Sequence, residues 1–138
     1  MELSRGLGDV YKRQCQALEA EGARVTYLPV DAQGRVHPSE LERALAEHDA
    51  REAAAGTNAP AALVSIMLAN NEVGTIEPVR ELAAIAHAHG AAFHTDAVQA
   101  VGHIPVDIQA LGIDALSLSG HKFHGPVSYT HLTLPTSN

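Results

Sequence analysis

The chain has little sulfur and little aromatic surface: its 138 residues include one cysteine, two methionines, two phenylalanines and no tryptophan. With Cys15 alone, an internal disulfide and a zinc site built from several thiolates are both excluded. Such cysteine usage is typical of a reducing compartment, and we expect a cytoplasmic protein. No apolar run approaches the roughly 18 residues that a membrane span needs, and residues 1–14 lack the apolar centre of a secretion signal. We therefore expect no membrane partner.

Positive charge is also scarce. The net charge is -7, and the nine lysines and arginines are scattered rather than gathered in a basic stripe, so we expect no nucleic-acid partner. Only Lys12 and Lys122 are lysines. Because a lysine amine can lose its proton and act as a nucleophile whereas a guanidinium cannot, Lys122, in the body of the chain, is a candidate catalytic residue. The alternative is an ordinary solvated surface lysine.

Hydrophobic residues make up 46% of the chain, enough for one modest core. We expect strands at Arg24–Val30, Ala61–Leu68, Ala91–Thr95 and Ile113–Ser119. Cys15–Glu21 is expected to form the last turns of a helix, and further helices are expected at Pro38–His48 and Val79–His89. A helical turn is expected at Val106–Leu111 and a linker over Asp49–Pro60. Strands and helices alternate, which predicts an α/β fold: a mostly parallel sheet flanked by helices.

Polar residues follow three of these strands. Asn70 and Asn71 come after the first, Asp96 and Gln99 after the second, and the run Ser119–Lys122 ends the third. Parallel sheets gather their chemistry at the carboxyl ends of the strands, so these residues are expected to meet in one crevice. Each also has an ordinary interpretation as a turn or cap residue, and a serine followed by glycine is a weak phosphate signal when it stands alone.

Some of these residue types would have a chemical use if an aldehyde or a pyridine ring lay in the crevice. The amine of Lys122 can form a Schiff base with an aldehyde. A buried Asp96 would keep the nitrogen of such a ring protonated, and the positive charge would make the ring an electron sink for a carbanion at the substrate α-carbon. The amide of Gln99 could donate a hydrogen bond to a ring hydroxyl.

The nine histidines raise the alternative of a metal site. His94 and Asp96 are expected to point to opposite sides of their strand. His121 and His124 would share a face only in a helix, which the neighbouring glycines and proline disfavour. We therefore predict no metal site. Cys15 is interpreted as a small buried residue rather than a nucleophile.

Together these segments closely resemble the large-domain core of the cysteine desulfurases, pyridoxal-phosphate enzymes of the class-V aminotransferase group. The resemblance rests on the stretch from Val64 to Pro126, with HTDAVQAVG and SGHKFHGP typical of the branch that serves nitrogen fixation and general iron–sulfur assembly. The upstream segment QALEAEGARVTYLPVDAQGRVHPSELERAL extends the likeness to residues 15–126. This range is expected to be part of the pyridoxal-phosphate-binding large domain of a fold-type I transferase.

The resemblance implies pyridoxal 5'-phosphate as the cofactor and a role for each matching residue. Lys122 would be the catalytic residue, forming the Schiff base with the cofactor and transferring protons. Asp96 would pair with the ring nitrogen, and Gln99 would reach the ring oxygen. These three residues are therefore expected to bind the cofactor.

The other implied contacts are with the phosphate and the substrate. Ser119 and His121 would contact the cofactor phosphate, and Asn71 would lie near the substrate carboxylate and the ring oxygen. The substrate would be L-cysteine, converted to L-alanine as its sulfur passes, as a persulfide, to sulfur-acceptor or scaffold proteins for iron–sulfur cluster assembly or tRNA thiolation. Proteins of this family are homodimers, which we also expect of the parent protein.

Residues 1–14 and 127–138 do not continue the family pattern and resemble translated adapter sequence. We expect both to be non-native tails, although Val127–Leu134 has a composition that favours a strand. The family's persulfide cysteine has no counterpart here, so this fragment is not expected to complete the reaction alone. Two alternatives stay open: another class-V enzyme, such as an aminotransferase or a kynureninase-like hydrolase, and a non-catalytic α/β module that binds a phosphate or a metal.

Overall fold

The computed structural model describes residues 2–4, 9–69, 74–100, 102, 104–119 and 130–133. In chain order the elements are β1 (Glu2–Ser4), α1 (Asp9–Ala20), β2 (Thr26–Leu28), α2 (Pro38–Ala55), β3 (Leu63–Met67), α3 (Val79–Ala88), β4 (Ala92–Asp96), α4 (Ile108–Leu111), β5 (Ala115–Ser119) and β6 (Thr130–Thr133). None of the helices in these ranges combines the length and the apolar character that a bilayer crossing requires.

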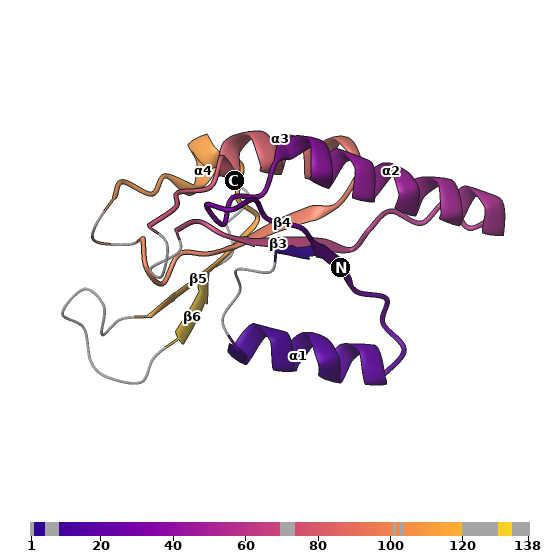
Figure 1. Cartoon of the computed structure of the whole chain (residues 1–138), viewed down its shortest axis with the longest axis horizontal. Helices are drawn as coiled ribbons and strands as arrows, with labels where there is room; N and C mark the ends of the chain where they lie inside the picture. The colour runs from indigo at the N-terminus through magenta and orange to yellow at the C-terminus, as the bar shows by residue number, and fades with distance from the viewer. Residues whose placement is uncertain are drawn as a thin grey trace.

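The strands of the described residues form one six-stranded sheet in the order β2-β1-β3-β4-β5-β6 (Figure 1). The first five pair in parallel, and β6 pairs antiparallel with β5. The predicted mostly parallel sheet flanked by helices is thus confirmed. β1 lies in the segment 1–14, where no element was predicted, whereas β6 lies where the composition of Val127–Leu134 favours a strand.

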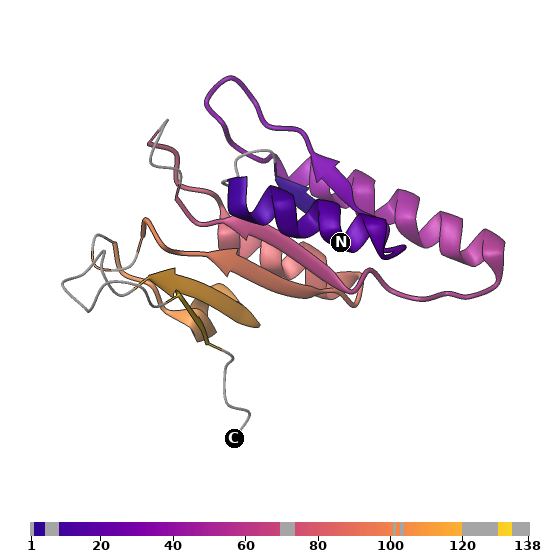
Figure 2. The same cartoon turned by 90° about the horizontal axis from the view of Figure 1, so that it is seen from below.

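Helices cover both faces of the sheet, as the two perpendicular views show (Figures 1 and 2). α2, α3 and α4 lie on one face, which we call the helical face, and α1 lies on the other. Successive strand residues point to opposite faces, so alternate residues of β3 and β4 meet the helices and build the core. Its largest fully buried side chains include Leu41, Leu45, Val64, Ile66, Leu82 and Phe93.

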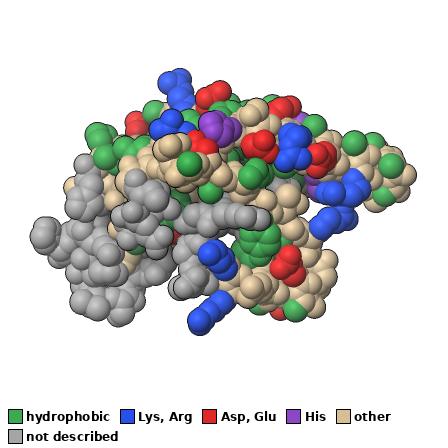
Figure 3. All heavy atoms as spheres, viewed as in Figure 1, with side chains coloured by type: hydrophobic (Ala, Val, Ile, Leu, Met, Phe, Trp, Pro, Cys, Tyr) green, Lys and Arg blue, Asp and Glu red, His purple; other side chains and the backbone are tan. Residues whose placement is uncertain are grey.

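Charged side chains gather on the outer surface of the helical layer (Figure 3). Arg43 on α2 lies 2.7 Å from a carboxylate oxygen of Glu40 and 2.8 Å from one of Glu47. Such exposed pairs along one helix contribute only a few tenths of a kcal/mol each, roughly 0.3–0.5. The layer is therefore held to the sheet by its apolar side.

α2 is longer than the sequence pattern predicted. The helix expected to end at His48 continues to Ala55, so the predicted linker is wrong over its first seven residues. Residues 49–55 (DAREAAA) are mostly good helix formers, and their propensity prevails although they bury little apolar surface. The helix ends where Gly56 adopts a left-handed conformation (φ 75°) and donates its N–H to the carbonyl of Ala53.

The other boundaries differ in smaller ways. The helix whose last turns were predicted at Cys15–Glu21 spans Asp9–Ala20. The strand predicted over Arg24–Val30 is limited to Thr26–Leu28, and β4 includes Asp96 as its last residue. Asp96 is therefore fixed by sheet hydrogen bonds rather than by a loop.

Candidate functional site

The carboxyl end of β4 places Asp96 in a buried position. Only 6% of this residue is exposed, and its carbonyl oxygen accepts the backbone N–H of Leu68 at 2.9 Å. The side-chain Oδ1 accepts the N–H of Val98, also at 2.9 Å, which closes the turn that follows the strand. Asp96 is thus a turn residue and also a buried carboxylate at the edge where α/β sheets bind their ligands.

Ser119 ends the neighbouring strand on the same face. Asp96 is the register partner of Ser117, and Ser119 lies two residues further along β5, so all three side chains share one face of the sheet. The backbone N–H of Ala97 donates to the carbonyl of Ser117 at 2.9 Å and fixes this register beyond the end of β4. Ser119 is 7% exposed. The structure therefore brings Asp96 and Ser119 to adjacent strand ends.

The remaining predicted residues are placed only in part. Gln99 lies half-buried in the turn after β4, whose Ala100 N–H donates to the carbonyl of Ala97. Asn71, His121 and Lys122 lie outside the described residues. The roles of all six cofactor-binding candidates, and the expected meeting of the Asp96 carboxylate with the Lys122 amine, stay predictions.

Three side chains form a hydrogen-bonded row across the same face of the sheet, and its central residue lies two positions before Asp96 on β4. Nδ1 of His94 on β4 lies 2.6 Å from Oγ of Ser65 on β3, and Nε2 lies 2.8 Å from Oγ of Ser117 on β5. All three residues are buried. Burial also lowers the pKa of His94, because desolvation penalises the charged ring. We call these residues the Ser65–His94–Ser117 row.

Sequence reasoning missed this row and misjudged its histidine. His94 and Asp96 were expected to point to opposite sides of the strand, which is wrong, since side chains two residues apart in a strand share a face. The sequence signal for the row is the period of two itself: His94 precedes Asp96 by two residues, and Ser117 precedes Ser119 by two. The partner Ser65 lies on another strand and follows only from the register.

Other groups of chemical interest lie outside β3, β4 and β5. Cys15 on α1 is 3% exposed, as predicted for a small buried residue, and desolvation raises the pKa of its thiol. The buried carboxylate of Glu77 accepts the N–H of Val36 at 3.0 Å, while desolvation raises its pKa. Among the described residues, no three His, Cys, Asp or Glu side chains are grouped as metal ligands would be.

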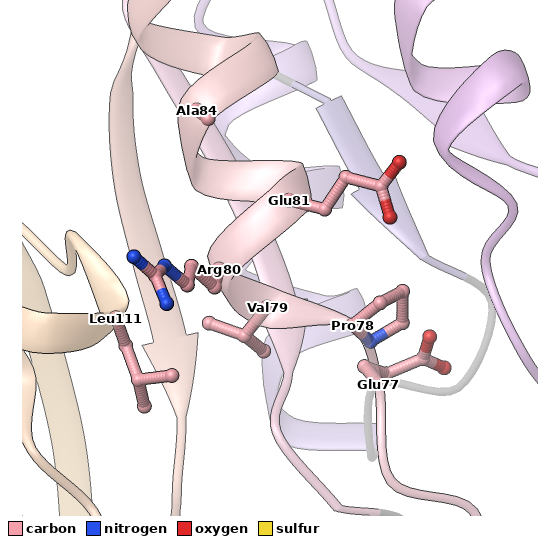
Figure 4. A pocket seen from close by; sticks show the side chains of 7 residues that line it. All are labelled: Glu77, Pro78, Val79, Arg80, Glu81, Ala84 and Leu111. Carbon is pink, nitrogen blue, oxygen red and sulfur yellow. The ribbon is translucent and has the colours of Figure 1, made fainter.

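An open hollow of about 540 Å³ lies at the N-terminal end of α3, on the helical side. Figure 4 shows Leu111 from α4 lying beside Val79 and Arg80 of α3, with Glu81 directed away from them. Its lining is mostly apolar, and none of the predicted site residues takes part. This hollow is therefore separate from the face that carries Asp96.

The described part of the strand-end edge suits a pyridoxal phosphate in its chemistry. A buried carboxylate is the partner that a protonated ring nitrogen requires, and a hydroxyl at the next strand end is a donor suited to a phosphate oxygen. Asp96 and Ser119 supply these two groups from adjacent strands on one face. The donor set present thus fits the cofactor that the sequence resemblance implies.

Comparison with known proteins gives a consistent result. The family model for aminotransferase class-V matches residues 13–134. The chain is 50% identical over 112 residues to the cysteine desulfurase IscS of Methanosarcina thermophila, a match that covers 81% of this chain and 25% of that protein. It is 48% identical over 109 residues to the IscS-like cysteine desulfurase of Mycobacterium tuberculosis, a match that covers 79% of this chain and 25% of that protein. The chain spans about a quarter of the length of these relatives.

Solved structures agree with this result. The NifS-like protein of Rickettsia africae superposes with a TM-score of 0.76 at 31% identity, covering 95% of this chain and 33% of that one. A structure described as SspA in complex with cysteine gives a TM-score of 0.81 at 31% identity, covering 96% and 35%. At 31% identity these structures resemble the chain in amino-acid sequence as well as in fold.

Proposed function

We propose that this chain, which belongs to the class-V aminotransferase family, is part of a pyridoxal-phosphate-dependent cysteine desulfurase. The parent enzyme would convert L-cysteine to L-alanine and pass the sulfur, as a persulfide, to acceptor or scaffold proteins of iron–sulfur or thiolation pathways. It would act in the cytoplasm as a homodimer. The observation that carries the proposal is the buried Asp96 at the end of β4, beside β5 and Ser119, in a chain about half identical to cysteine desulfurases.

Three residues of this chain would hold the cofactor ring and the reacting centre. The Asp96 carboxylate would hold a proton on the ring nitrogen, and the Gln99 amide would donate to the ring oxygen. The Nζ amine of Lys122 would bind the cofactor and move a proton to and from the substrate. When bound, pyridoxal phosphate supplies an electron sink that weakens bonds at the substrate α-carbon.

Three further residues would fix the remaining groups. Ser119 and His121, which flank Gly120 after β5, would bind the cofactor phosphate through a hydroxyl and an imidazole N–H. The Asn71 amide would orient the substrate carboxylate. Burial of Asp96 supports its role, because a carboxylate shielded from water interacts more strongly with a cation placed beside it.

The two lysines make the binding test simple. The chain is incubated with pyridoxal phosphate, reduced with borohydride, digested and analysed by mass spectrometry, and we expect the label on the peptide that contains Lys122. Lys122→Arg should abolish this label, whereas Lys12→Arg, at an exposed position of α1, should leave it unchanged. Label that stays in Lys122→Arg, or label on Lys12 alone, would contradict the proposal.

Activity requires the rest of the enzyme, so its test uses a chimera. Residues 15–126 replace the matching quarter of an IscS-type cysteine desulfurase, and alanine and sulfide released from L-cysteine are measured. We expect both products from the chimera and neither from its Lys122→Arg variant. A chimera that binds pyridoxal phosphate but releases no sulfide from cysteine would favour a different class-V activity.

A further inference from the structure

The Ser65–His94–Ser117 row has a direction that its hydrogen atoms determine. Burial keeps the His94 ring neutral, and a neutral imidazole has one donor nitrogen and one acceptor nitrogen. In one arrangement Ser65 donates to Nδ1 and the Nε2–H donates to Ser117, whose own hydroxyl proton then points elsewhere. In the reverse arrangement Ser117 donates to Nε2, and the Nδ1–H donates to Ser65. The contact distances of 2.6 and 2.8 Å allow either.

The neighbour of Ser117 distinguishes the two arrangements. Ser117 and Asp96 are register partners on adjacent parallel strands, about 4.8 Å apart, and their side chains lie on the same face. An ionised carboxylate only accepts hydrogen bonds. Among the described residues, the Ser117 hydroxyl is hydrogen-bonded to His94 and not to Asp96, so Asp96 acts on it through its charge. In the first arrangement the Ser117 O–H can point toward the anion, whereas in the reverse arrangement its lone pairs face the anion. The register therefore favours the first.

We propose that His94 is a positioning residue, held as the Nε2–H tautomer between Ser65 and Ser117, so that the Ser117 hydroxyl proton points toward the Asp96 carboxylate. A hydroxyl dipole directed at a carboxylate stabilises its ionised form. The use of this effect, which is to keep Asp96 charged beside a ring nitrogen, rests on the proposed function. The tautomer of His94 and the direction of the row do not depend on the proposed function.

Side-chain ¹⁵N NMR of the cofactor-free chain at neutral pH tests the direction. The signal of His94 is the one that disappears in His94→Gln, and it is also the one that moves in both Ser65→Ala and Ser117→Ala. We expect the Nε2–H tautomer in the wild type. In Asp96→Asn the ratio of the Nε2–H to the Nδ1–H tautomer should fall about threefold or more, because the anion that favours it is gone. An Nδ1–H tautomer in the wild type, or an unchanged ratio in Asp96→Asn, would overturn the inference.

Cofactor titration tests the use of the row. Ser117→Ala should weaken pyridoxal phosphate binding, followed by absorbance, by about fivefold or more. The matched control is Thr95→Val, which removes a buried hydroxyl bonded to the Ile66 carbonyl at 2.7 Å on the opposite face of β4, and it should change binding by less than about twofold. Equal weakening by both variants would overturn the role of Ser117. A wild type that binds no pyridoxal phosphate would overturn the proposed function, and the tautomer measurement would still decide the inference.

Discussion

The two faces of the sheet are built by the same strands and have opposite characters. On the helical face, Val64 and Phe93 are fully buried among the apolar side chains of α2 and α3. One residue along each strand, Ser65 and His94 lie on the other face and form hydrogen bonds with their neighbours. Alternate residues of a single five-residue strand can thus serve two purposes, with one set packing in the core and the other forming the polar contacts of the site.

The energetic consequences differ between the faces. Burial of apolar surface contributes about 25 cal/mol per Å², so the helical face supplies most of the stability. A buried polar group gains only about 1 kcal/mol from a satisfied hydrogen bond and costs more when its partner is removed. Substitutions on the helical face should therefore reduce stability, whereas substitutions at the strand ends of the other face should reduce ligand binding.

The largest effect is expected at Phe93. Phe93→Ala should lower the free energy of unfolding by about 3–5 kcal/mol, because it removes a fully buried ring and leaves a cavity in a close-packed layer. Urea denaturation followed by circular dichroism measures this change. The control Ala92→Ser, at the adjacent exposed position, should change the same quantity by less than about 0.5 kcal/mol. A similar loss in both variants would remove the distinction between the faces.

The second effect is on binding and concerns Asp96. Asp96→Asn keeps an oxygen for the Val98 N–H but removes the charge, so the affinity for pyridoxal phosphate should fall by about 1.5–3 kcal/mol, with a smaller change in unfolding free energy. Absorbance titration measures the affinity for pyridoxal phosphate, and urea denaturation measures the free energy of unfolding. As a control, Asp107→Asn on the helical side should leave the affinity unchanged. If Asp96→Asn lost stability and kept its affinity, the assignment of chemistry to this face would be wrong.

A polar contact on the helical side should affect stability alone. Asp107 caps α4 by accepting the N–H of Ala110 at 3.0 Å. Asp107→Ala should lower the unfolding free energy by about 0.5–2 kcal/mol, because the cap is lost, and should leave pyridoxal phosphate affinity as in the wild type. Parallel denaturation and absorbance titrations test this, and a coupled loss of both would show that the two faces are not independent.

The smallest effect is a pH dependence within the helical layer. His89 at the end of α3 lies 2.5 Å from Asp49 and 3.0 Å from Glu42, and these hydrogen bonds, that to Asp49 foremost, raise its pKa. A raised folded-state pKa stabilises the protein below the ordinary value near 6.5, and the contribution disappears as the pH rises through the raised value.

Removal of this histidine should flatten that pH dependence. The unfolding free energy of the wild type should fall by about 0.2–1 kcal/mol more between pH 6 and 9 than that of His89→Gln. Urea denaturation at several pH values measures the difference. Equal slopes in the two proteins would show that these ion pairs contribute nothing to stability.

Much of the fold could be predicted from local patterns. The apolar runs of β3, β4 and β5 and the spacing of α3 carry their own signals, and the structure confirms them. β1 could not be found, because its three residues are too few to show a period. The extension of α2 beyond His48 was missed because its outer half buries too little apolar surface to show a period. Helix propensity holds it, together with ion pairs of Asp49 with His89 and of Glu52 with Arg24.

The site could be predicted only where it is local in sequence. Asp96 and Ser119 are recognised as polar residues at the ends of apolar strands, and the structure puts these ends side by side. The row through His94 joins residues on three strands, so it depends on a register that no local pattern contains. The sequence does show that His94 and Asp96 are two residues apart and so share a face of the strand. The prediction that they point to opposite sides was wrong and hid this relation.

The backbone bonds that continue past the ends of β3 and β4 have a consequence for how such a site changes over evolution. The amides of Leu68 and Ala97 donate to carbonyls of the next strands, so the points from which the loops depart are held by the sheet itself. Insertions or deletions in those loops would alter which molecules are admitted while leaving the departure points in place. Deuterium exchange would reveal this arrangement as slow exchange of the Leu68 and Ala97 amides.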